Sequence, residues 1–250
     1  MNRSGQIASL DRFLLRPEHG SGSWSYNIWD RKGDPLLFAD CPAHPFFGYV
    51  RAVACIALGI GAFLGASMLI PESLPGPSGA LLKFAAFLVP LLAAALALSQ
   101  RYGTTIFLDG SMREVYLKIH QENRVPLPYT WYTVIDQTGH TIGRIRRSLY
   151  HMLILRRWHA YRPDGSLLCV ANEDSVVRSV LGRIVGSRFA PMRSNYTLTE
   201  AKVGAVVGWF ERRRLTFGCF VLDMSPDYKR TIDRRMALAL GVMLDAGERP

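Results

Sequence analysis

Two long apolar runs interrupt this chain, and short alternating runs occupy most of the remainder. Residues 52–70 contain no charged residue, and residues 80–98 contain only Lys83. Each run has about the 20 residues that a helix needs to cross a bilayer. The segment between them, residues 71–79, is too rich in Pro and Gly to continue a helix. The pattern therefore predicts a two-helix transmembrane hairpin over residues 51–101.

Small residues in the first run suggest how such a hairpin would pack. Ala57, Gly61 and Gly65 are four residues apart, so they share one face of a helix. Small residues at this spacing allow two helix backbones to approach closely in lipid. Their partner would be either the second run or the first run of another copy, which would make a homo-oligomer.

Basic residues near the two runs predict an orientation. Arg51 precedes the first run and Arg101 follows the second, whereas residues 71–79 contain no Lys or Arg. Basic residues collect on the cytoplasmic side of membrane helices. Arg also outnumbers Lys by 25 to 5, which is typical of a GC-rich bacterial genome. We therefore expect an integral protein of a bacterial inner (plasma) membrane with both termini in the cytoplasm.

Outside the apolar runs, one pattern recurs four times: an alternating run, a turn with Asp and Gly, and a second alternating run. The turns lie at residues 30–33, 109–110, 136–139 and 164–165. Period-two alternation around such turns is typical of β-hairpins, and Gly accepts the positive φ that the turns require. We expect a polar N-terminal tail over residues 1–23, a first β-hairpin over 24–40 and a mainly β domain over 102–247.

Two further segments have helical spacing. Residues 173–185 begin with Glu173 and Asp174, and acidic residues favour the first turn of a helix. The second is a C-terminal helix over residues 230–246, which is apolar on every side from residue 236 to residue 244. It is too short to cross a membrane, so protein must enclose it. Its predicted core positions are Met236, Leu238, Leu240, Val242, Met243 and Leu244.

The net charge of +10 is concentrated in the last 150 residues, which contain 23 Lys and Arg against 14 Asp and Glu. Five arginines, Arg144, Arg146, Arg147, Arg156 and Arg157, flank the apolar residues 149–155. Guanidinium groups bind phosphate in bidentate fashion, and anionic lipid attracts a basic domain beside it. These arginines are the candidate site for anionic phospholipid. The alternative is a β-hairpin with solvated arginines and apolar residues that face its core.

Motifs for catalysis and for metal binding are missing from the sequence. The histidines show no HExxH spacing, the four cysteines form no CxxC pair, and no GxSxG or phosphate-binding loop occurs. Asp223, Asp227 and Asp233 are too sparse for the six to eight oxygens that calcium prefers. No known nucleic-acid-binding motif is present. We expect a non-catalytic protein with no metal, no cofactor and no nucleic-acid partner.

The order of these predicted elements resembles that of the tubby-like C-terminal barrel superfamily. The elements are β-hairpins with an Asp- and Gly-containing turn, a middle helix, more strands and a wholly apolar last helix. That superfamily includes phospholipid scramblases and plant LURP-one-related proteins. The best-matching segments are residues 132–146, 158–174 and 222–246. The resemblance implies an α+β, mainly β fold: a closed antiparallel barrel of about twelve strands around the C-terminal helix. The transmembrane hairpin would be an insertion in this barrel.

We therefore expect a membrane-anchored, non-catalytic, tubby-like protein that binds anionic phospholipid or a protein partner at the cytoplasmic face. One alternative is a scramblase-like oligomer that moves lipid. Another is an enzyme with the barrel as its substrate pocket. A C-terminal helix that fills the barrel would favour the first function over the enzyme.

Overall fold

The fold was analysed in a computed structural model of the chain. The structure describes residues 3–19, 24–30, 33–41, 45–69, 77–97, 103–123, 128–148, 157–174, 195–212 and 219–246. The chain divides into two compact units. One consists of Met1–Pro42 together with Arg101–Pro250, and the other is Ala43–Gln100.

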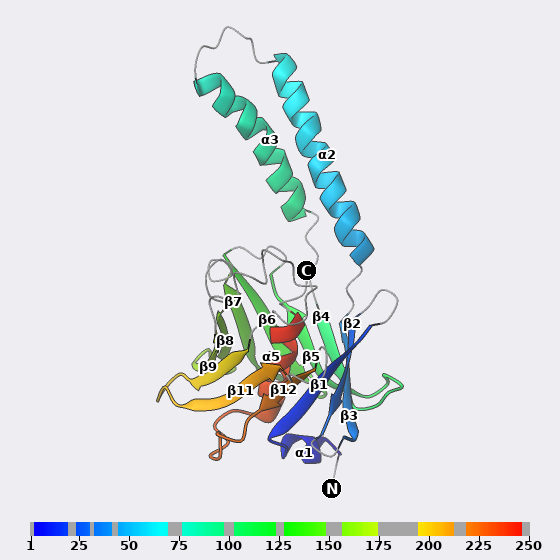
Figure 1. Ribbon diagram of the computed structural model, residues 1–250, viewed down its shortest axis with the longest axis vertical. Coiled ribbons are helices and arrows are strands. Elements are labelled where there is room, and N and C mark those ends of the chain that lie inside the picture. The colour runs from blue at the N-terminus through cyan, green and yellow to red at the C-terminus, as the bar shows by residue number, and fades with distance from the viewer. Residues whose placement is uncertain are drawn as a thin grey trace. The chain divides into compact units, whose positions relative to one another are not determined.

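Within its described residues, the first unit contains twelve antiparallel strands that form a closed barrel (Figure 1). Every strand pairs with its neighbours in the sequence, and the first strand closes the barrel against the last. The strands are β1 (Arg12–His19), β2 (Trp24–Trp29), β3 (Pro35–Cys41), β4 (Gly103–Phe107), β5 (Val115–Gln121), β6 (Tyr129–Asp136), β7 (Thr141–Ser148), β8 (Arg157–Tyr161), β9 (Leu167–Glu173), β10 (Tyr196–Glu200), β11 (Val206–Arg212) and β12 (Phe220–Asp223). The expected mainly β fold with a closed antiparallel barrel is confirmed.

The N-terminal segment is part of the barrel, in contrast to the polar tail expected over residues 1–23. It forms helix α1 (Arg3–Ala8) and strand β1, which pairs with both β2 and β12. Phe13 and Leu15 alternate into the core, where both are at most 1 % exposed. The charges between and around them, such as Arg12 and Arg16, point outward. Because these charges dominate the local composition, the alternation of apolar and polar residues that marks a strand is difficult to recognise in the sequence.

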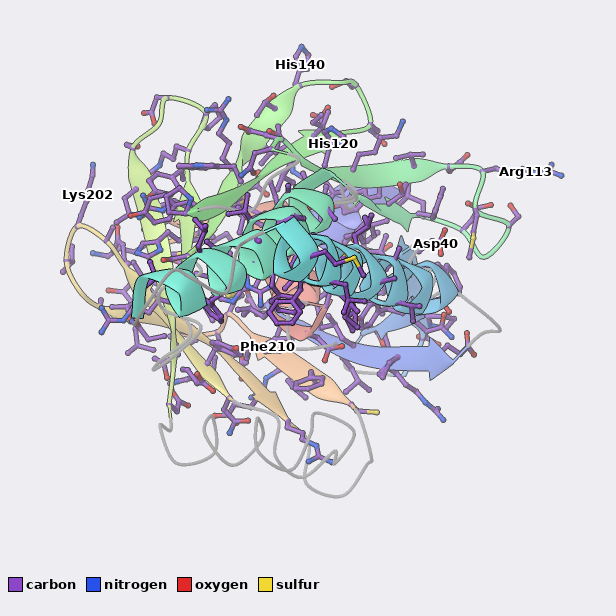
Figure 2. All side chains as sticks on the ribbon, turned by 90° about the horizontal axis from the view of Figure 1, so that it is seen from above. Asp40, Arg113, His120, His140, Lys202 and Phe210 are labelled. Atoms are coloured by element: carbon purple, nitrogen blue, oxygen red, sulfur yellow. The ribbon has the colours of Figure 1, made fainter. Side chains whose placement is uncertain are left out.

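Three of the four predicted turns have their glycine at a positive φ, whereas in the turn after β4 the residue with a positive φ is Met112, at 57°, and not Gly110. Gly33, Gly139 and Gly165 have φ values of 92°, 86° and 82°, which L side chains rarely adopt. In the turn between β6 and β7, a carboxylate oxygen of Asp136 accepts hydrogen bonds from the backbone amides of Thr138 and His140 at 2.9 and 3.0 Å. Figure 2 shows Arg113, His140 and Lys202 on projecting turns of this unit.

Helix α5 (Arg234–Ala246) lies inside the ring of strands (Figure 1). The six predicted core positions, Met236, Leu238, Leu240, Val242, Met243 and Leu244, are all at most 6 % exposed. The helix packs so closely on β11 and β12 that a Cβ atom at Gly241 would be 3.3 Å from Leu222 and 3.5 Å from Phe210. The prediction of an enclosed C-terminal helix is therefore confirmed.

The N-terminal end of α5 is held by a buried arginine. Arg234 is 4 % exposed, and its Nη1 atom donates to Oδ2 of Asp227 at 2.7 Å. Its Nε and Nη2 atoms donate to Oδ1 of Asp11 at 2.9 and 2.7 Å, and it also donates to the carbonyl oxygens of Ile232, Met224 and Asp227. The network ties the helix to the segment before β1.

The expected helix over residues 173–185 does not begin at Glu173. This residue ends β9, is 6 % exposed, and pairs with Tyr196 of β10. The acidic pair Glu173 and Asp174 resembles a helix start in the sequence, but the backbone of Glu173 is part of the sheet. Residues 175–185 lie outside the described residues.

The second unit is a helical hairpin of α2 (Pro45–Leu69) and α3 (Pro77–Ala97). Both helices begin at a proline, where the missing N–H costs nothing because first-turn amides have no intrahelical acceptor. Pro77 therefore starts α3, although the Pro- and Gly-rich composition of residues 71–79 predicted a start at residue 80.

The two helices contact through a different face from the predicted one. Gly59 lies against α3, where an added Cβ would be 3.0 Å from a ring carbon of Phe87. Ala57 is exposed, and nothing lies within 4 Å of a Cβ placed at Gly61 or Gly65. The predicted small residues are therefore present in α2, but the residue that lies close to α3 is Gly59, which is two residues from both Ala57 and Gly61.

The transmembrane prediction is wrong. No helix among the described residues combines the length and apolar character that a membrane crossing requires. The prediction rested on the length and the apolar composition of residues 52–70 and 80–98 in the sequence. The two integral spans, their orientation and the inner-membrane assignment are withdrawn with it.

Candidate binding site

The five arginines predicted as a site do not form one cluster. Arg144, Arg146 and Arg147 belong to β7, and Arg157 begins β8, whereas Arg156 lies outside the described residues. Successive residues of a strand point to opposite faces of a sheet. Arg144 and Arg146 therefore share the outer face of the barrel, and Arg147 lies on the inner one.

Arg147 packs on the core. It pairs across the sheet with Trp158 of β8, a side chain only 1 % exposed. The Cζ atom of Arg147 is 5.1 Å from the centroid of the Trp158 ring, which is within the range of a cation–π contact. This arginine covers an aromatic core residue and does not belong to an outer binding surface.

Arg144 is on the outer face, but its charge is compensated. Its Nε atom lies 3.0 Å from Oε1 of Glu122, the residue that follows β5. The same carboxylate oxygen accepts a hydrogen bond from the hydroxyl of Thr133. The ion pair makes Arg144 a weak candidate for binding a further anion.

Arg146 is surrounded by aromatic rings. Its direct cross-strand neighbours are Trp131 on β6 and His159 on β8. Its Cζ atom lies 4.9 Å from the ring centroid of Tyr129, 5.5 Å from that of Trp131 and 5.3 Å from that of Tyr161. The rings of Trp131 and Tyr161 also contact each other, with centroids 5.2 Å apart. We call Tyr129, Trp131, Arg146 and Tyr161 the aromatic–arginine cluster.

The guanidinium of Arg146 has donors but no acceptor in the described part of the chain. Its Nε atom is buried without a hydrogen-bond partner there, and no described carboxylate forms an ion pair with it. Two residues further along the same face, the buried hydroxyl of Ser148 also lacks a partner among these residues. An arginine fixed by rings and left without an anion is a preorganised donor.

The phenol group of Tyr161 stays neutral at physiological pH. Burial raises the pKa of Tyr161, and the neighbouring Tyr129 adds to this, while the charge of Arg146 acts in the opposite direction. A neutral phenol can donate a hydrogen bond. The polar atoms of the cluster are therefore chiefly donors, and the one formal charge is positive.

The aspartates considered for calcium engage arginines instead. Asp223 binds Arg12 at 2.5 Å, and Asp233 binds Arg235 at 2.7 Å. Burial opposes ionisation of Asp227, but hydrogen bonds from the amide of Ile232, from Arg234 and from Thr231 outweigh it and lower the pKa of this carboxyl. Within the described residues, no group of three or more His, Cys, Asp or Glu side chains is placed to hold a metal ion.

Sequence reasoning selected Arg146 but missed the rings that hold it. Tyr129 and Trp131 alternate with buried Thr130 and Tyr132, and Tyr161 follows buried Ala160 in the same way. This alternation marks the three rings as outward-facing. The run of arginines is the more conspicuous signal in the sequence, but the cross-strand register determines which arginine meets aromatic neighbours.

Comparison with known proteins adds little to this geometry. No family model matches the chain, and no curated protein matches it. The X-ray structure of an Arabidopsis thaliana protein aligns with 95 % of this chain and 92 % of its own, at 11 % sequence identity and a TM-score of 0.29. That score is too low to support an argument, so the tubby-like resemblance stays an interpretation.

Proposed function

We propose that this chain is a non-catalytic binding protein built on a tubby-like barrel, and that it binds a protein partner through the outer face of β6, β7 and β8. The aromatic–arginine cluster would be the centre of the contact. The observation that carries this proposal is the guanidinium of Arg146, held by three rings and left without an anionic partner among the described residues.

The composition of the cluster supports a protein contact. Tyr, Trp and Arg are the residues most enriched among those that dominate the energy of protein–protein interfaces. Their side chains are already ordered by contacts with one another, so less conformational entropy is lost on binding. Tyr129 is 38 % exposed, which leaves part of its ring available to a partner.

The interior of the barrel supports a non-catalytic function. Side chains of α5 such as Leu238, Leu240 and Leu244 join the strand residues in one hydrophobic core. A barrel filled in this way differs from one that encloses a substrate, which was the basis of the enzymatic alternative. Neither that alternative nor lipid movement gains a specific supporting observation in the described residues.

A peptide titration tests the proposed function. The probe is an acetylated, amidated heptapeptide of alternating Gly and Glu, added to the purified full-length chain. We expect saturable binding that weakens with added salt, because salt screens the attraction between exposed charges. Trp131→Leu and Arg146→Gln should each weaken binding, the second by about tenfold, the contribution of one charge-assisted hydrogen bond.

Arg113→Gln is the matched control. It removes the same charge from a turn between β4 and β5, and it should leave the affinity unchanged. Near-ultraviolet circular dichroism would verify that each variant keeps its packed core. Equal affinity of the wild type, Arg146→Gln and Arg113→Gln would contradict the proposal.

A further inference from the structure

We infer that the ligand group recognised by Arg146 is a carboxylate, and that the site prefers it to a phosphate monoester. This inference rests on the proposed function and identifies the chemistry of the partner. The occupant would be an acidic segment of a protein, with one Asp or Glu side chain seated at the terminal nitrogens of Arg146.

Among the described residues of β7 and β8, the number of immobilised cations on the outer face matches a single negative charge. On the outer face of β7, Arg146 is held by rings, whereas Arg144 already forms an ion pair with Glu122. Arg147 lies over Trp158 on the other face of the sheet. Arg157 is exposed at the start of β8, where solvent screens its charge. One ordered guanidinium balances a carboxylate but only half the charge of a phosphate dianion.

Glu122 neutralises the other arginine on the outer face of β7. This carboxylate is held on the outer face by Arg144 and by Thr133, which is opposite Arg144 in the sheet. Arg144 is two residues from Arg146 on the same strand face. The opposite charges of the pair largely cancel at a distance, so Arg144 does not supply a second cation for a dianion bound at Arg146.

The aromatic contacts restrict the direction from which a ligand can bind. Three rings lie around the guanidinium, and the Nε atom is buried. The terminal nitrogens are therefore the donors left for a ligand. A carboxylate is planar and matches the planar donor pair of a guanidinium. The exposed part of Tyr129 would contact the aliphatic stem of the same side chain.

Three matched heptapeptides test the inference on the full-length chain. The first alternates Gly and Glu, the second has Gln in place of the central Glu, and the third has phosphoserine there. Fluorescence anisotropy of labelled peptides would give each affinity. We expect the Glu peptide to bind about tenfold more tightly than the Gln peptide, and at least as tightly as the phosphoserine peptide.

Variants of the chain test which residue causes the preference for the Glu peptide. In Arg146→Gln, the Glu and Gln peptides should bind equally, whereas Arg157→Gln and Ser148→Ala should keep the preference for Glu. Ser148→Ala is informative because its hydroxyl is buried and should not reach the ligand. Long-range attraction alone would favour the more highly charged phosphoserine peptide, so the expected order cannot arise from net charge.

The outcomes separate this inference from the proposed function. Tighter binding of the phosphoserine peptide, still dependent on Arg146, would overturn the carboxylate preference and leave the binding function standing. Arg146-dependent binding to vesicles with anionic lipid, without binding to any peptide, would overturn both. Absence of any binding that depends on Arg146 would also overturn both.

Discussion

Replacing Asp227 with Asn tests how the barrel holds its central helix. Arg234 and Asp227 are 4 % and 3 % exposed, and their charged atoms are 2.7 Å apart. Asn has the size of Asp but no charge, so Arg234 would lose its fully buried counter-ion. Asp11 would still pair with Arg234, but its side chain is 44 % exposed and therefore better screened.

The expected cost is large because a buried charge would lose its partner. Removing one partner of a buried ion pair typically lowers the free energy of unfolding by about 3–5 kcal/mol. The hydrogen bonds that Asp227 accepts from the amides of Thr231 and Ile232, at 2.8 and 3.0 Å, would be only partly replaced by Asn. We expect the variant to lose about 3 kcal/mol or more of its free energy of unfolding.

Denaturant unfolding followed by tryptophan fluorescence measures this loss, with the midpoint compared at an unchanged slope. Asp233→Asn is the matched control, because its ion pair with Arg235 is more exposed and should contribute about 1 kcal/mol or less. The double variant Asp227→Asn/Arg234→Met should recover much of the stability, since no buried charge is left alone. The reasoning is refuted if Asp227→Asn loses less than its Asp233 control.

Three further predictions concern the same unit. The pKa of Asp227 is lower in the folded state than the value of about 3.9 in the unfolded state, so the ionised carboxylate stabilises the fold above that value. The free energy of unfolding should therefore decrease below pH 4 in an acid titration, and Asp227→Asn should make this decrease smaller. Leu240→Asp would bury an unpaired carboxylate at a cost of several kcal/mol, so an unchanged thermal midpoint would show that α5 is not enclosed. Gly143→Ala would place a Cβ 2.4 Å from the carbonyl oxygen of Tyr161 and 3.2 Å from the sulfur of Met236. It should lower the thermal midpoint, whereas Gly5→Ala, with nothing within 4 Å, is its control.

Local sequence patterns predicted much of the barrel because turn and strand signals are local. The turns at Asp136 and Gly165 need particular residue types, and residues 236–244 of α5 are apolar on every side. Strand β1 was missed because its outward charges conceal the buried Phe13 and Leu15. The helical hairpin was found, but its assignment to a membrane was wrong, since no helix among the described residues has the length and apolar character of a membrane span.

The candidate site was harder to predict because it depends on cross-strand register. The sequence placed Arg144, Arg146 and Arg147 together, but the pleat of β7 puts Arg147 on the inner face, and Glu122 compensates Arg144. The first effect follows from alternation along one strand once β7 is recognised as a strand, whereas the second depends on how the strands pair. Pairing of β7 with β6 and β8 brings Trp131 to Arg146, and that long-range information is absent from local pattern.

A double-mutant cycle between Arg146 and the central Glu of the heptapeptide tests the central claim most directly. The four affinities come from wild type and Arg146→Gln, each titrated with the Glu peptide and the Gln peptide. A direct contact predicts a coupling free energy of about 1 kcal/mol or more between the two groups. A coupling near zero, with both single changes weakening binding, would mean that Arg146 and the carboxylate do not meet, and it would contradict the proposed site.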